Sequence, residues 1–79
     1  MFEAKELDGI EWQQVVSHRT ESGCWQVEIT WALDKYRISV VALHSAFGEG
    51  RVIKCAHAWY VRTAIARANR FLRQYEVRA

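Results

Sequence analysis

An alternation of large apolar residues with mostly polar ones between positions 24 and 33 limits the folds open to this chain more than any other feature. Its apolar members are Trp25, Val27, Ile29, Trp31 and Leu33, and the residues between them include Gln26, Glu28 and Thr30. Successive side chains of a strand point to opposite faces of a sheet, so a period of two predicts a half-buried β-strand over 24–33. In a helix the same apolar residues would be scattered around the whole circumference.

Two neighbouring segments also have the pattern of strands. Residues 10–17 form the first, and residues 36–43 follow the alternating segment after a short polar turn at 34–35. A short turn between two alternating segments predicts an antiparallel hairpin. Val41 and Leu43 break the alternation of the last strand, so we expect that end of it to be covered on both sides.

Beyond Gly50 the pattern changes to that of a helix, which we expect from about residue 55 to residue 75. This stretch has neither Pro nor Gly and is rich in good helix formers. At about 100° per residue one side is an apolar stripe suited to the core. The stripe consists of His57, Val61, Ala64, Ile65, Ala68, Phe71, Leu72 and Tyr75. Residues 51–54 fit either a fourth strand or the approach to the helix.

Together these elements predict one α+β domain over residues 1–79. A three-stranded antiparallel sheet, or a four-stranded one if 51–54 is a strand, packs on one long C-terminal amphipathic helix in the order β-β-β-α. Four Trp, three Tyr and three Phe supply large side chains for a small core. Residues 1–9 fit either a flexible arm or a short helix.

Composition points to the cytoplasm. No segment approaches the roughly 18 apolar residues of a membrane span. Residues 1–6 lack the basic and apolar regions of a signal peptide. In a reducing compartment we expect Cys24 and Cys55 to be free, buried thiols, with a disulfide between them as the alternative.

The charges are divided unevenly along the chain. Residues 1–50 carry four Lys or Arg and eight Asp or Glu, a net charge of −4, whereas residues 51–79 carry seven and one, a net charge of +6. This asymmetry predicts either an attraction between the two halves or a basic surface for an acidic partner.

The polar side of the predicted helix is the candidate binding surface. Residues three and four apart share a helix face, and the candidates on this face are Trp59, Arg62, Thr63, Arg67, Arg70 and Arg73. No carboxylate lies among them. Guanidinium groups bind carboxylates and phosphates in a bidentate manner, and Trp is frequent at interface centres and in nucleic-acid grooves. The alternative is a solvated helix face, with Arg near the C-terminus favoured by the helix dipole.

We expect no catalytic site, no metal site and no cofactor. His18 and His44 are expected in connections, and Cys55 and His57 would lie about 200° apart on a helix, too far to share a metal. A dyad of a histidine with Cys24 or Cys55 can be drawn. One sheet and one helix nevertheless leave little room for a substrate cleft.

The three strands and the helix entered through Gly48-Glu49-Gly50-Arg51 resemble the later part of a double-stranded RNA-binding domain, over residues 12–76. The resemblance implies a β-β-β-α layout and the binding of nucleic acid. Two features of that family have no counterpart. Only residues 1–9 stand where the family has an N-terminal helix, and residues 52–56 stand where it has paired lysines. No RNA-binding residue is therefore carried over.

Three functional hypotheses follow. In the first, a non-enzymatic binding protein docks on an acidic protein surface or a nucleoprotein complex through the Arg/Trp face and the 44–50 loop. Compact, motif-free proteins of this size are frequently phage- or plasmid-encoded inhibitors of host nucleic-acid-processing complexes, of the anti-CRISPR type. In the second the same face binds nucleic acid directly. In the third the chain is a homodimer with Val41 and Leu43 as candidate contacts. None of the three involves a membrane.

Overall fold

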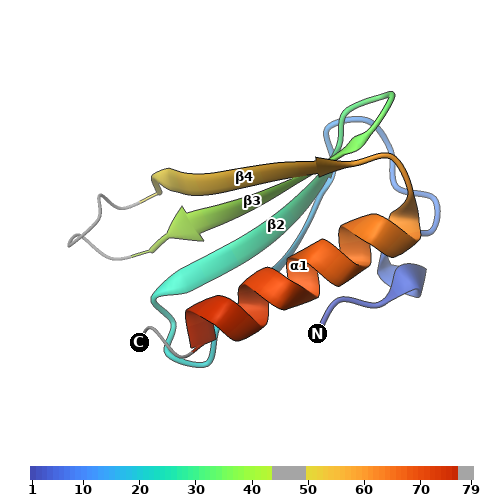
Figure 1. Ribbon diagram of the computed structural model, residues 1–79. Coiled ribbons are helices and arrows are strands. Elements are labelled where there is room, and N and C mark those ends of the chain that lie inside the picture. Colours follow the sequence, from blue (N-terminus) through green and yellow to red (C-terminus); the bar gives the residue numbers. More distant parts are fainter. Residues whose placement is uncertain (44–49, 77–79) are drawn as a thin grey trace.

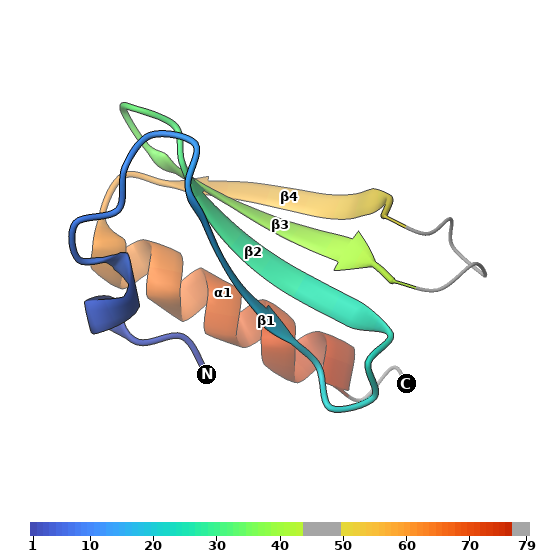
Figure 2. The same cartoon turned by 180° about the vertical axis from the view of Figure 1, so that it is seen from behind.

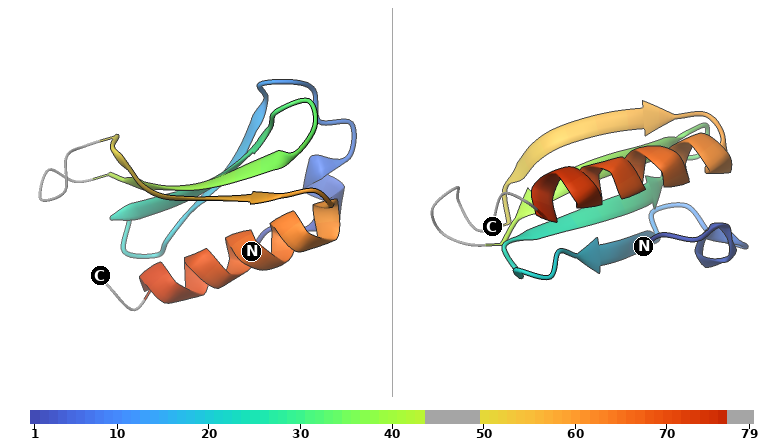
Figure 3. Two further views of the ribbon diagram at one scale, coloured as in Figure 1. Left: turned by 45° about the horizontal axis from the view of Figure 1, so that its top comes forward. Right: turned by 60° about the horizontal axis from the view of Figure 1, so that its bottom comes forward.

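The computed structural model describes residues 1–43 and 50–76, and within them a four-stranded sheet packs on one helix (Figure 1). The elements are η1 (Ala4–Leu7), β1 (Val15–Arg19), β2 (Trp25–Trp31), β3 (Tyr36–Ala42), β4 (Val52–Ala58) and α1 (Val61–Glu76). The strands are antiparallel and neighbour one another in chain order. Figure 3 shows the sheet and α1 as two layers, with α1 along one face.

The predicted α+β class is confirmed, but the helix begins later than the sequence pattern indicates. It starts at Val61 rather than near residue 55, because residues 52–58 form β4. β4 pairs with β3 from Tyr36↔Ala58 to Val41↔Val52, with an irregularity between Val40 and Val41. The four-stranded alternative is therefore correct. His57 lies exposed on this strand and is not part of the helix stripe.

The remainder of the predicted stripe faces the sheet. Ala64 and Ala68 are completely buried, and three larger side chains are buried toward the end of the helix. The larger ones are Phe71, Leu72 and Tyr75. The sheet contributes Val27, Ile29, Ile38 and Val40, all with no exposed surface. Small residues on the helix opposite branched ones on the strands let the two layers approach closely and fill the space between them.

Residues 1–9 are packed against the domain. Phe2 and Leu7 are each 3% exposed. The side-chain oxygen of Asn69 on α1 accepts the N–H of Phe2 at 2.8 Å, and its amide nitrogen donates to the Phe2 carbonyl at 3.2 Å. Figure 2 shows the segment beside α1 and β1. Of the two expectations for these residues, the short helix is correct, and it takes the form of η1.

The Glu6 side chain ties this segment to β1 through a 2.7 Å hydrogen bond to Nε2 of His18. Burial raises the pKa of Glu6, but the N–H of Glu3 and the His18 side chain together outweigh burial and hold that pKa below its ordinary value of 4.5. The stabilisation from Glu6 is therefore present above pH 4.5 and is lost as the pH falls through the folded-state pKa.

We expect Glu6→Gln to lower the free energy of unfolding at neutral pH and to have much less effect at a pH below the folded-state pKa of Glu6, where the wild-type carboxylate is protonated in both states. Urea unfolding at the two pH values measures the difference. Asp8→Asn removes an exposed carboxylate from the same segment and serves as the control. An equal loss at both pH values would contradict the role assigned to the Glu6 charge.

Candidate interaction surfaces

Three of the predicted arginines are exposed on α1 without a partner of opposite charge. Arg62, Arg70 and Arg73 are solvent-exposed and make no ion pair within residues 1–43 and 50–76. The ion pairs of this part of the chain, Lys5–Glu3 and His18–Glu6, both lie in its first 18 residues. Within the described residues the acidic half therefore does not neutralise the basic half through ion pairs. We call Arg62, Arg70 and Arg73 the arginine face.

Arg67 differs from the arginines on either side of it. Its guanidinium donates a hydrogen bond to the backbone carbonyl of His57 on β4. β4 is an edge strand, with β3 as its partner on one side. The bond attaches α1 to β4 and occupies one of the backbone carbonyl groups on the open edge of the sheet. The sequence pattern predicts Arg67 as a binding residue, but the structure gives it an intramolecular contact. Thr63, another candidate, is half-buried.

Trp59 does not share the helix face. It lies in the connection between the last residue of β4, Ala58, and the first residue of α1, Val61. Nζ of Lys35 stands over the Trp59 ring, 5.8 Å from its centroid. The spacing of Trp59 from Arg62 would continue a helical period only if the helix began before residue 59. The helix cannot begin there, because the chain is still part of β4 at Ala58.

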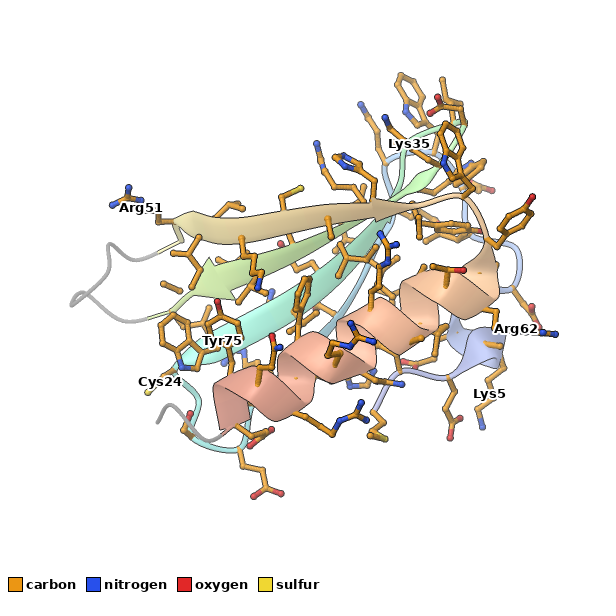
Figure 4. All side chains as sticks on the ribbon, in the orientation of Figure 1. Lys5, Cys24, Lys35, Arg51, Arg62 and Tyr75 are labelled. Carbon is orange, nitrogen blue, oxygen red and sulfur yellow. The ribbon has the colours of Figure 1, made fainter. Side chains whose placement is uncertain are left out.

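Trp59 instead belongs to a group of large apolar side chains exposed at one end of the molecule, which we call the aromatic end. Its members and their exposed fractions are Trp12 at 56%, Leu33 at 62%, Trp59 at 66% and Tyr60 at 73%. They come from three connections that Figures 1 and 2 place at the same end. Figure 4 shows Lys35 and Arg62 at this end and Arg51 and Tyr75 at the other. Local patterns assign each member to a strand or to the helix, so they offer no reason to group the four.

The backbone at the aromatic end is held in uncommon conformations. Leu33 has a φ of +71° and Gln13 one of +70°. The N–H of Asp34 donates to the Ala32 carbonyl at 2.8 Å across Leu33, which makes a γ-turn of the rarer, positive-φ kind. The N–H of Gln13 donates to the Trp31 carbonyl at 3.1 Å and holds the segment of Trp12 beside the hairpin.

The cysteines and histidines depart from several expectations. Cys24 and Cys55 are free, as expected, but Cys55 is exposed and Cys24 is only half-buried. Their sulfur atoms contact the carbonyls of Ser22 and Ala56 rather than a histidine. His18 lies on β1 and not in a connection.

Because β4 is a strand, Cys55 and His57 lie on one face of the sheet instead of opposite sides of a helix. No cluster of three or more His, Cys, Asp or Glu placed to hold a metal occurs in the described residues. His44 lies outside them, as does most of the 44–50 loop.

Arg73 also lines an open hollow of about 490 Å³ between α1 and β1. The other lining residues are Met1, His18, Arg19, Glu21, Leu72 and Glu76. The Glu76 carboxylate accepts the N–H of Glu21 at 3.2 Å from each oxygen. Since carboxylates and cations share its wall, the hollow does not select for an anion.

No helix within residues 1–43 and 50–76 is long and apolar enough to cross a membrane.

Comparison with protein-family models, with curated proteins and with solved structures finds no match to this chain. What the protein binds must therefore be inferred from its own residues.

Proposed function

We propose that this is a non-enzymatic binding protein that docks on a larger, negatively charged macromolecular surface through the arginine face. The observation that carries the proposal is the exposure of Arg62, Arg70 and Arg73 without a carboxylate partner in the described part of the chain. Guanidinium groups in this state keep their donors available for bidentate contacts with carboxylates or phosphates. Arg67 supports the surface by holding α1 against β4.

An acidic protein surface, alone or within a nucleoprotein complex, fits this face better than bare nucleic acid. Proteins that bind single strands place stacking aromatic rings along the same basic path as their cations. Here the exposed rings gather at the aromatic end, whereas Arg70 and Arg73 lie toward the other end of α1. From Arg62 to Arg73 the arginine face extends about 16 Å along the helix.

A domain of this kind acts on its partner by occupying a surface. Inhibition of a host nucleic-acid-processing complex, of the anti-CRISPR type, is one form of such occupation, in which the arginine face covers an acidic patch or a nucleic-acid path. The small size of the domain, with a radius of gyration of 12.0 Å, suits the steric blocking of one site on a larger assembly.

The double substitution Arg70→Glu and Arg73→Glu tests this proposal. We expect it to weaken capture of the partner from the source cell by about 100-fold or more, because each reversal replaces an attraction by a repulsion. The free energy of unfolding should change by less than about 0.5 kcal/mol per site, since both side chains are exposed.

A matched control separates the arginine face from net charge. Arg37→Glu with Arg51→Glu changes the total charge by the same amount at two exposed positions away from α1, and capture should survive it. Equal loss in both double variants would reject the arginine face. A mobility shift with single- and double-stranded RNA and DNA, at two salt concentrations, tests direct nucleic-acid binding, whose affinity falls steeply with salt.

A further inference from the structure

We infer that the aromatic end is a self-association surface, through which two copies of this chain join about a twofold axis. This contact meets the arginine face only at Arg62, and it does not depend on what Arg70 and Arg73 bind. Three features of the aromatic end lead to it, namely its area, its charge and its rigidity.

The exposed apolar area matches the centre of a protein interface. Large aromatic side chains offer roughly 150–250 Å² each. With more than half of each of its four side chains exposed, the aromatic end presents an apolar area on the order of 500 Å². Apolar patches of about 300–600 Å² on monomers are often functional, and a standard interface buries about 800 Å² per partner. The aromatic end can therefore supply the apolar centre, and its polar neighbours the rim.

The charges around this end allow two copies to meet. The segments 4–14, 31–37 and 59–62 build the end and its surroundings. Their carboxylates are Glu6, Asp8, Glu11 and Asp34, and their cations are Lys5, Lys35, Arg37 and Arg62. These four acids and four cations have a net charge of zero. Two copies of the arginine face would repel each other, whereas here Asp34 of one copy can face Arg62 of the other.

The low net charge of the aromatic end also argues against a polyanion as its occupant. Stacking of nucleic-acid bases on Trp12, Trp59 or Tyr60 would bring phosphates to a part of the surface whose segments carry no net positive charge. Binding to nucleic acid draws its affinity from phosphate neutralisation by a net positive surface. A protein surface of mixed charge brings no unneutralised phosphates to this end, and the aromatic end of a second copy is such a surface.

The contact residues are held in place before association. The γ-turn fixes Leu33, and Lys35 stands over the ring of Trp59. The rings of Trp31 and Tyr36 lie 4.8 Å apart at the base of the same hairpin. Side chains and turns that are already ordered lose little entropy on binding, which favours association.

The homodimer contacts predicted from the sequence, Val41 and Leu43, do not belong to the aromatic end. Val41 is only 8% exposed and cannot contribute a contact surface. Leu43 is half-buried and lies toward the opposite end of the sheet.

Sedimentation velocity and multi-angle light scattering at rising concentration test the inference. We expect the wild-type chain to pass from 9.2 kDa to twice that mass. Trp59→Ser with Tyr60→Ser should raise the dimer dissociation constant by about 100-fold or more, because truncating interface aromatics often costs over tenfold each. A wild-type chain that stays monomeric at every concentration, or a dimer unchanged by this double variant, would overturn the inference.

Further variants keep the test decisive. Leu33→Asn removes an apolar contact with a residue that tolerates positive φ, so it should fold normally and still weaken the dimer. Val52→Ser alters an exposed apolar residue at the far end of β4 and should leave the dimer intact. Dimerisation lost in Val52→Ser but kept in the aromatic variants would assign the contact to the edge strand instead. Arg70→Glu with Arg73→Glu should still dimerise, so failure of either proposal can be told from failure of the other.

Discussion

Replacing Ile38 by Ala is expected to lower the free energy of unfolding by about 2–5 kcal/mol, since it removes buried methyl groups and leaves a cavity. Ile38 has no exposed surface and stands in the middle of the sheet, opposite Ile29 on β2 and Ala56 on β4. At roughly 0.05–0.15 kcal/mol per residue, a chain of 79 residues has a total stability of about 4–12 kcal/mol. A substantial part of that stability therefore depends on this one side chain.

Urea unfolding followed by circular dichroism measures the loss. Val15→Ala is the control, because Val15 is an exposed strand residue and its truncation should change the stability by no more than about 0.5 kcal/mol. A loss of less than about 1 kcal/mol for Ile38→Ala, on the order of an exposed substitution, would show that the sheet does not have the assigned buried face.

Enlarging Ala68 is expected to be the second most damaging change. Ala68 has no exposed surface at the place where α1 packs on the sheet. A leucine there must displace either the helix or the strands, and overpacking of a close-packed core costs about 1–3 kcal/mol. Because leucine and alanine both favour helix, little of the loss would come from helix propensity.

Ala66→Leu is the matched control for this substitution. It makes the same chemical change two residues earlier on the same helix, at an exposed position. We expect thermal unfolding to show a much lower midpoint for Ala68→Leu and nearly the wild-type midpoint for Ala66→Leu. Similar midpoints for the two variants would contradict the assignment of the buried side of α1.

Short-range patterns predicted most of the fold. The alternation around Ile29 and the hairpin turn after it depend on neighbouring residues, and so does the stripe of Ala64 and Ala68. All three appear in the structure, but the turn is centred on Leu33 and Asp34 rather than on 34–35. β4 could not be assigned in this way. Its residues, with Ala56 and Ala58 among them, are compatible with helix, and only pairing with β3 makes them a strand.

The candidate surfaces were predictable to different degrees. Exposure of Arg62, Arg70 and Arg73 follows from their position opposite the apolar stripe of α1. The aromatic end does not follow from any local pattern, because the three connections that carry its residues come to the same end of the molecule only through the path of the chain in space. The contact of Arg67 with β4 could not be predicted either, because the sequence pattern did not decide whether the residues before the helix form a strand.

The bond from Arg67 to the His57 carbonyl has a consequence for mutational scanning. Without the guanidinium, the His57 carbonyl on the open edge of β4 would become available to the extended chain of another molecule, and such pairing at a sheet edge is a common start of aggregation. Arg67→Ala could then abolish activity by removing protein from solution while every binding contact stays intact. A scan that scores activity alone would count Arg67 as part of the recognition surface. A turbidity measurement on Arg67→Ala would instead show that the substitution causes aggregation.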